Sequence, residues 1–258
     1  PALSSFYGTY IGKQRHDPNY IDSARIPADF ENGIEGMNWL NADAAYFPYK
    51  WALYSAGHAN LDINKFDPKE DMIRNRDPNT FVLGDSGGFQ IGKGVWEGNW
   101  KDPNCPKASK KRAQVLSWLD AYSDRGMILD IPAWVARDPA GQRATGISTY
   151  QEAVDATYIN NEYFMKNRTG RCKFLNVLQG ENHTDADDWY DRMKKYCDPK
   201  QYAQPFEGWA MGGQNMCDIH LVLKRLVALR FDGLLESGLH DWMHFLGTSK
   251  LEWATLLT

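Results

Sequence analysis

The chain has 258 residues, a formal net charge of −4, and a composition that is 43% hydrophobic and 13% aromatic. This length suits one α/β domain of barrel size or two small domains, and the aromatic content is sufficient for a large core. No apolar run is long enough to span a bilayer and no basic-then-apolar leader opens the chain, so a membrane or secreted protein is disfavoured. The charge does not by itself indicate nucleic-acid binding, which follows a local basic patch and not the sum.

The cysteines and histidines do not indicate a metal site. The four cysteines lie far apart, without a Cys-x-x-Cys pair, at Cys105, Cys172, Cys197 and Cys217. The six histidines show no metal-ligand spacing either. We therefore expect reduced thiols in an intracellular, cytoplasmic protein, with no cofactor held by this chain.

The first 41 residues combine turn residues and aromatics with weak periodicity. We expect residues 1–41 to form an N-terminal extension that packs on the main domain, with Ser5 to Gly12 as a strand or hairpin arm. Residues 42–258 would form the main domain. Its first strand is predicted at Ala42 to Phe47, before Pro48.

Further elements alternate along the main domain. Strand-like runs are predicted at 81–84, 127–131, 174–178, 208–211 and 243–246. Helical patterns are predicted at 107–125, 148–170, 184–196 and 217–230, and a capping box at Ser249-x-x-Glu252 opens one more helix. The pattern in 217–230 predicts a buried face of Ile219, Leu223, Leu226 and Val227.

Strands that alternate with helices imply parallel βα units, so the predicted fold is an α/β, (β/α)8 TIM-type barrel. Six strands are countable, whereas such a barrel needs eight. The chain stops at Leu256-Leu257-Thr258, inside an apolar helical pattern. We therefore expect the barrel to be truncated after about six βα units, with its C-terminal part missing.

Unusual polar or glycine residues follow four of the predicted strands. They are Asp85-Ser86-Gly87-Gly88-Phe89-Gln90, Asp130, Gln179-Gly180 and Gly212-Gly213. A barrel brings the carboxyl ends of its strands to one rim, where catalytic groups collect. Each stretch alone has a structural explanation as a turn or cap, but the coincidence of four favours a site.

The first of these stretches suits a planar, polar heterocycle such as a nucleobase. Gly87 and Gly88 allow a flat ligand to approach the main chain. Phe89 supplies a flat apolar face, and Ser86 and Gln90 supply directional hydrogen bonds.

The string from Asp85 to Gln90 resembles the signature of the tRNA-guanine transglycosylase superfamily, whose enzymes exchange guanine for a 7-deazaguanine. The resemblance covers roughly Ala42 to Thr258. It implies Asp85 as catalytic general acid/base and Phe89 as the platform on which the base stacks. It also implies that Asp130 holds the guanine amidine edge and Gln179 contacts the base carbonyl. The full substrate-binding set implied in this way is Ser86, Gly87, Gly88, Phe89, Asp130, Gln179, Gly180, Gly212 and Gly213.

Base exchange at C1′ needs a carboxylate nucleophile that holds the sugar covalently and a second group that protonates the leaving guanine. In the family, the nucleophilic aspartate lies on the strand after the one at 243–246, and a Cys/His zinc site lies further on. Both positions would fall beyond Thr258, so the resemblance implies neither in this chain.

The stretches after two strands differ from the tRNA enzymes. Here they are Asp130-Ile131-Pro132-Ala133-Trp134 and Gly212-Gly213-Gln214-Asn215. The chain is more similar to the phage and bacterial branch that places 7-deazaguanines in DNA, in which case the compartment would be the bacterial cytoplasm. We expect guanine or a 7-deazaguanine such as the 7-cyano form as ligand and DNA as the polymer, which requires flipping the target base. The best candidates for phosphate contacts are Lys107, Lys110, Lys111 and Arg112.

Three alternatives stay open. The polymer could be tRNA with the same chemistry, or the chain could be a non-catalytic nucleobase-binding partner subunit that lacks the nucleophile. A third alternative is an unrelated barrel hydrolase that uses Asp85 and Asp130 as paired carboxylates.

Overall fold

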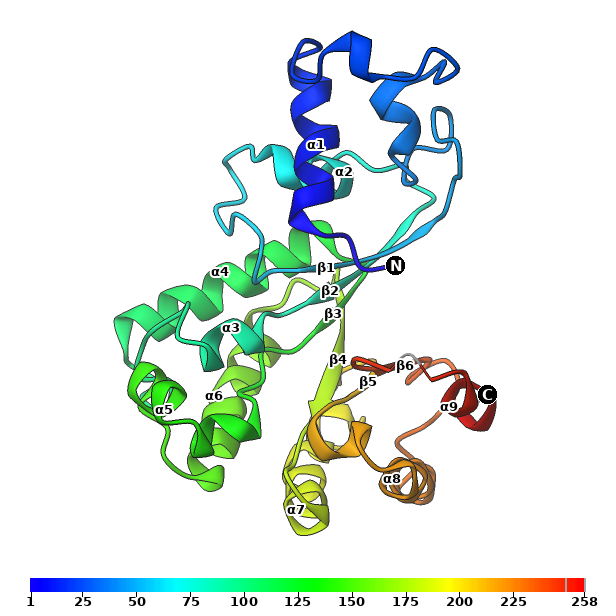
Figure 1. Ribbon diagram of the computed structural model, residues 1–258. Coiled ribbons are helices and arrows are strands. Elements are labelled where there is room, and N and C mark those ends of the chain that lie inside the picture. Colours follow the sequence, from blue (N-terminus) through cyan, green and yellow to red (C-terminus); the bar gives the residue numbers. More distant parts are fainter. Residues whose placement is uncertain (249, 258) are drawn as a thin grey trace. The chain divides into compact units, whose positions relative to one another are not determined.

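The computed structural model (Figure 1) describes residues 1–248 and 250–257, apart from the side chain of Gln214. The fold is α/β, as predicted. Each described strand pairing is parallel, and the strands are ordered as they occur in the chain, β1-β2-β3-β4-β5-β6. Helices lie between the strands in sequence, which is the pattern of successive parallel βα units.

The chain forms two compact units. The first consists of residues 1–86, 114–126 and 170–172, and the second of 87–113, 127–169 and 173–258. Residues 1–41 and 42–86 therefore belong to the same unit.

The first unit contains a short parallel sheet and several helices. Its elements are α1 (Ser5–His16), η1 (Ser23–Arg25), η2 (Gly33–Met37), β1 (Trp51–Ser55), η3 (Pro68–Glu70), α2 (Asp71–Arg74), β2 (Phe81–Asp85), the second half of α4 (Pro106–Tyr122) and the start of β3 (Arg125–Met127). In the β1–β2 pair, Ser55 lies opposite Asp85. The last residues of the two strands are therefore neighbours.

Aromatic and aliphatic side chains fill the core of the first unit. Tyr54, Met72 and Trp118 are almost fully buried. Gly84 of β2 allows α4 to pack closely, since a Cβ at this position would lie 2.5 Å from Cδ2 of Leu119. A side chain at residue 84 would force the strand and the helix apart.

The strand or hairpin arm predicted near the N-terminus is wrong, because that segment is helix α1. Ser4 caps the helix by accepting a hydrogen bond from the N–H of the third helical residue. Gly8 and Gly12, one turn apart, face η3 so closely that a Cβ would lie 2.4 Å from the carbonyl oxygen of Lys69 and 1.9 Å from that of Pro68. Figure 1 shows α1 and α2 side by side. Gly8 and Gly12, which indicated turns in the sequence, thus lie on a face of α1 without side chains, against which the backbone of η3 packs.

The strand predicted at Ala42–Phe47 is also wrong, because the first strand, β1, begins at Trp51, four residues after the predicted strand ends. The carbonyl of Asn41 accepts hydrogen bonds from the N–H groups of Ala44 and Ala45, which folds this segment into turns. Phe47 is 87% exposed. The side-chain Oδ1 of Asn41 also accepts from the N–H of Asp43 at 3.3 Å, so local turn formation around Asn41 overrides the apolar pattern here.

The second unit contains the rest of the βα pattern. Its elements are α3 (Gly88–Gly92), the first half of α4, the end of β3, η4 (Ala133–Arg137), α5 (Pro139–Thr145), α6 (Tyr150–Asn167), β4 (Lys173–Leu178), α7 (His183–Met193), η5 (Lys194–Cys197), β5 (Gly208–Met211), η6 (Gly213–Met216), α8 (Ile219–Phe231), β6 (Trp242–Phe245) and α9 (Leu251–Leu257). β4 pairs with β5 and β5 with β6. The N–H of Ile128 donates to the carbonyl of Leu175, at 3.0 Å, so the chain just after β3 lies beside β4.

Most predicted elements of the second unit are confirmed. β4, β5 and β6 lie within one residue of the predicted runs, as does β2 in the first unit, whereas β3 ends at residue 127 and not at 131. The predicted helices correspond to α4, α6, α7, α8 and α9. The predicted cap Ser249 lies outside the described residues.

The predicted buried face of α8 is wrong. Leu223 is 38% exposed and Val227 68% exposed, whereas Leu221, Val222 and Leu229 are buried. This helix carries apolar residues on more than one side, so its periodicity allows two faces. The packing of the second unit selects the face that the sequence did not favour.

Candidate functional site

Asp85 and Ser86, at the end of β2, lie in the first unit. The Asp85 carboxylate accepts a hydrogen bond from the hydroxyl of Ser55, with 2.5 Å between Oδ2 and Oγ. The sheet register explains this contact, because Ser55 and Asp85 are paired in β1 and β2. Ser86 is 1% exposed, and its hydroxyl has no hydrogen-bond partner among the described residues.

The other residues of the predicted rim lie in the second unit, where Asp130 and Gln179 form a direct pair. The Nε2 of Gln179 donates to Oδ2 of Asp130 at 2.7 Å. The two side chains are only 7% and 8% exposed. A carboxylate and an amide, both polar and both buried, therefore lie side by side after strands β3 and β4.

Glycines surround this pair where backbone segments pass close to it. A Cβ at Gly88 would lie 2.6 Å from the carbonyl oxygen of Asp130 and 3.2 Å from its Oδ1. A Cβ at Gly213, whose φ is +56°, would lie 2.7 Å from Oε1 of Gln179 and 2.6 Å from the carbonyl oxygen of Gly180. At Gly212, a Cβ would lie 3.0 Å from Nε2 of Gln179. Gly88, Gly212 and Gly213 therefore lie against the carboxylate–amide pair.

Asn215 connects the two loops that carry this site, and the sequence analysis did not select it. Its side chain is fully buried, and its Nδ2 lies within hydrogen-bond distance of the carbonyls of Leu178, Gln179 and Gly212, at 3.3, 3.2 and 3.0 Å. A polar residue shortly after a buried strand was the signal available, since the same rule identified Gln179. The amide ties the ends of β4 and β5 together.

The strand end that carries Asp130 is held from α6. The N–H of Ile131 donates to Oγ1 of Thr157 at 2.9 Å, and Nδ2 of Asn160 donates to the carbonyl of Leu129 at 2.7 Å. Arg112, from α4, donates from Nε to Oδ1 of Asn160 at 2.6 Å. Both flanks of Asp130 are thus fixed by buried side chains.

The buried position of Arg112 contradicts the prediction that four basic residues form a phosphate-binding cluster. This side chain is 2% exposed, so it supports the strand end and is not part of a basic surface. Lys111 is half-buried with its Nζ 5.0 Å from the ring centre of Trp96, and burial, together with the charge of Lys110, lowers the pKa of Lys111. Lys107 and Lys110 are exposed. Two lysines of the predicted cluster thus remain as surface cations.

Phe89 lies in a mixed aromatic and cationic cluster. Its ring centre is 5.9 Å from that of Trp134, and Nζ of Lys93 lies 5.5 Å from the Phe89 ring and 5.0 Å from the Trp134 ring. Phe89 is 58% exposed. More than half of the surface of Phe89 is therefore accessible to solvent, and the Lys93 ammonium lies over its ring.

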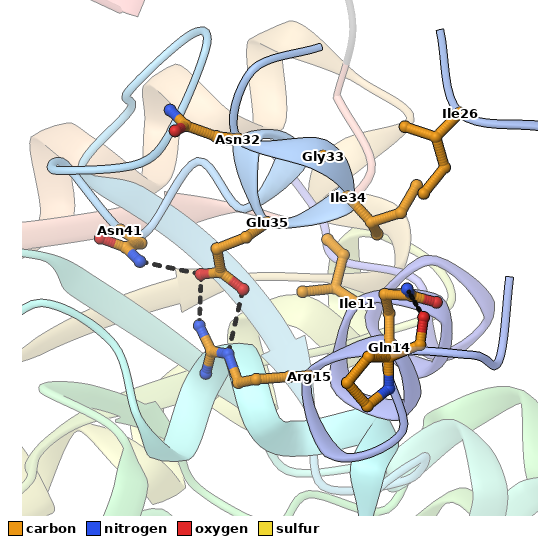
Figure 2. A pocket seen from close by; sticks show the side chains of 10 residues that line it. Ile11, Gln14, Arg15, Ile26, Asn32, Gly33, Ile34, Glu35 and Asn41 are labelled. Carbon is orange, nitrogen blue, oxygen red and sulfur yellow. Dashed lines mark hydrogen bonds and ion pairs between the residues drawn. The ribbon is translucent and has the colours of Figure 1, made fainter. Parts of the chain in front are cut away.

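A different cavity lies in the first unit, lined mainly by α1 and η2 (Figure 2), and has a volume of about 420 Å³. Ile11 and Ile34 supply apolar walls, and Arg15, Glu35 and Asn41 supply polar groups. Those polar groups bond one another, since Glu35 accepts hydrogen bonds from Arg15 and Asn41. None of the sequence-predicted site residues lines this cavity. The network explains the cavity as part of the packing between α1 and η2.

The described residues contain neither a metal-binding cluster nor a membrane-spanning helix. Within residues 1–248 and 250–257, no cluster of three or more His, Cys, Asp and Glu side chains has the arrangement needed to hold a metal ion. In the same part of the chain, no helix combines the length and the apolar character that crossing a membrane requires.

Comparison of the chain with protein-family models, curated proteins and solved structures finds no match. The site must therefore be interpreted from its own geometry. In the second unit, the structure brings together Gly88, Asp130, Gln179, Gly180, Gly212 and Gly213. The residues that the sequence analysis missed are Ser55, Lys93, Trp134, Thr157, Asn160 and Asn215. Ser55 ends an apolar strand, which is the signal that identified Asp85.

Proposed function

We propose that this chain belongs to a (β/α)-barrel glycosyltransferase that exchanges guanine in DNA for a 7-deazaguanine. The observation that carries the proposal is the buried pair of Asp130 and Gln179, packed against the main chain of Gly88, Gly212 and Gly213. The parallel βα architecture supports the barrel, and the resemblance of Asp85 to Gln90 to the transglycosylase signature supports the chemistry.

The pair suits the edge of guanine. This edge presents two N–H donors, N1 and N2, beside the O6 acceptor. Ionised Asp130 offers only acceptors, and the Gln179 amide offers donors. A carboxylate next to an amide donor therefore matches two donors next to a carbonyl, and glycine main chain leaves space for a flat ring.

Asp85 is the proposed proton carrier. Protonation of the departing guanine and deprotonation of the incoming base need a carboxyl group held in one orientation. The hydrogen bond from Ser55 fixes one oxygen of Asp85. The covalent sugar intermediate needs a carboxylate nucleophile as well.

The test measures binding and exchange separately. Titration of the chain with free guanine tests the recognition pair, and Asp130→Asn should weaken binding at least about tenfold, because it replaces an ionised acceptor by an amide. Exchange of labelled guanine into duplex DNA or tRNA, using the protein that carries this chain, tests the reaction. Asp85→Asn should abolish exchange, while Asp29→Asn, at an exposed position of the first unit, should not.

The outcomes separate the alternatives. Exchange into tRNA alone would replace DNA as the substrate. Guanine binding without exchange would favour a non-catalytic partner subunit. Absence of guanine binding by the wild-type chain would overturn the proposal.

A further inference from the structure

The cluster of Phe89, Lys93 and Trp134 lies on the two elements that flank the recognition pair in the second unit. Phe89 follows Gly88, which packs on Asp130, and belongs to α3. Trp134 is four residues after Asp130, in η4. The cluster is therefore built from two of the segments that also form the proposed guanine site.

Packing against α3 holds the indole of Trp134 in place. A Cβ at Gly92 would lie 2.5 Å from Cη2 of Trp134, so the indole rests directly on the backbone of α3. The Phe89 and Trp134 rings are inclined by 55° with their centres 5.9 Å apart. One indole edge is thus fixed by packing, which reduces the conformational entropy that a ligand would have to remove on binding.

The cluster combines the two features that nucleotide binding requires. Phe89 is 58% exposed and so presents aromatic surface to solvent. Lys93 is exposed, and its ammonium nitrogen lies 5.5 Å from the centre of the Phe89 ring and 5.0 Å from that of the Trp134 ring. Bases stack on aromatic side chains, and a cation beside them attracts the phosphate that joins one nucleotide to the next.

We infer that Phe89, Lys93 and Trp134 form a second nucleotide subsite, which takes the nucleotide adjacent to the target guanine in a single-stranded or extruded strand. Trp134 stacks on the neighbouring base, and Lys93 leaves the rings to contact the connecting phosphate. A peptide or a second copy of the chain could supply an aromatic ring, but neither carries a phosphate at regular spacing from it. The inference extends the proposed function, since the strand is that of the proposed substrate.

The experiment measures binding of fluorescein-labelled ten-residue oligothymidylate and of an abasic deoxyribose-phosphate strand of equal length, at several salt concentrations. Trp134→Ala should weaken binding of the oligothymidylate roughly 5- to 150-fold and leave the abasic strand unaffected. Lys93→Gln should weaken both and reduce the magnitude of the salt slope by about one. Trp134→Phe, which keeps a stacking face, should recover most of the affinity.

Matched controls use the same unit. Val95→Ala removes an exposed apolar side chain, and Lys166→Gln removes an exposed cation of α6. Neither should change either affinity. Circular dichroism and thermal unfolding establish that each variant is folded, and Lys93→Gln, at an exposed position, keeps the test valid if Trp134→Ala does not fold.

Two results would overturn the subsite. The first is an unchanged affinity for oligothymidylate in folded Trp134→Ala and Lys93→Gln. The second is a change in the sedimentation of the free variants without a change in strand binding, which would indicate a protein interface. The strand-binding assay does not involve guanine exchange, which is measured separately. Normal exchange with unchanged strand affinity in the variants would contradict the subsite alone, whereas loss of strand affinity in a protein that performs no exchange would contradict the proposed reaction alone.

Discussion

Gly88→Ala should disrupt the candidate site through one contact. The new Cβ would lie 2.6 Å from the carbonyl oxygen of Asp130, whereas ordinary contact begins at 3.4 Å. The segments must therefore separate by about 0.8 Å, the difference between those two distances. The nearest atom is backbone and not the end of a flexible side chain, so the strand end that carries Asp130 has to move with it.

The magnitude of the effect has two parts. Overpacking of this kind costs about 1–3 kcal/mol, and the higher helix propensity of alanine in α3 returns at most about 1 kcal/mol of it. Displacement of a recognition group by about 1 Å can reduce activity about 100-fold. We therefore expect guanine affinity or exchange to fall by one to two orders of magnitude, with a modest loss of stability.

The assay compares guanine titration and thermal unfolding of Gly88→Ala with those of Gly98→Ala. Neither glycine has a positive φ, so backbone strain does not distinguish them. A Cβ at Gly98 would meet its nearest atom at 3.3 Å, close to ordinary contact. Guanine affinity and thermal stability of Gly88→Ala equal to those of the wild type would refute the proposed contact between α3 and Asp130.

Three further predictions concern other parts of the chain. Ser55→Ala removes the hydroxyl that donates to Asp85 and holds one of its oxygens, so the exchange rate should fall while guanine affinity stays unchanged, with Ser55→Thr restoring the rate; an unchanged rate would exclude a positioning role. Burial opposes ionisation of Glu35, but hydrogen bonds from Arg15 and two asparagines outweigh it and lower the pKa of Glu35. This contribution to stability should be present above the ordinary glutamate pKa of about 4.3 and be lost as pH falls through the lowered value; urea unfolding from pH 7 to pH 3 should show this loss in the wild type and a smaller one in Glu35→Gln. Asn215→Ala leaves three buried carbonyls without its amide and should destabilise the protein by about 2–4 kcal/mol in denaturant unfolding; a loss below about 0.5 kcal/mol would mean that water or another group satisfies them.

The sequence predicted the βα order and most strand ends because buried strands between turn residues are a local pattern. It also predicted that Asp130, Gln179 and the glycines at 212 and 213 would meet, since parallel strands bring their carboxyl ends to one edge. The role of Gln179 was assigned toward a ligand, whereas in the structure its amide bonds Asp130. That pairing depends on side-chain orientation, which spacing does not determine.

The errors have physical causes that lie outside the local pattern. α1 was missed because Gly8 and Gly12 serve a tight contact with η3, which is distant in sequence. Arg112 was placed on the surface because a run of basic residues usually lies there, yet its partner Asn160 is 48 residues away. Trp134 and Lys93 gave no signal, because their meeting depends on the packing of η4 on α3.

The hydrogen bond between Asp130 and Gln179 has a consequence for selectivity. Because each group already satisfies the other, an incoming molecule must replace an existing bond, and the net gain in free energy from each replacement is small. A molecule that presents an acceptor toward Oδ2 of Asp130 cannot replace the hydrogen bond from Gln179, so its entry would cost the buried carboxylate that bond. In the proposed guanine site, such an arrangement discriminates against a molecule with the wrong edge, such as adenine, more strongly than it retains guanine.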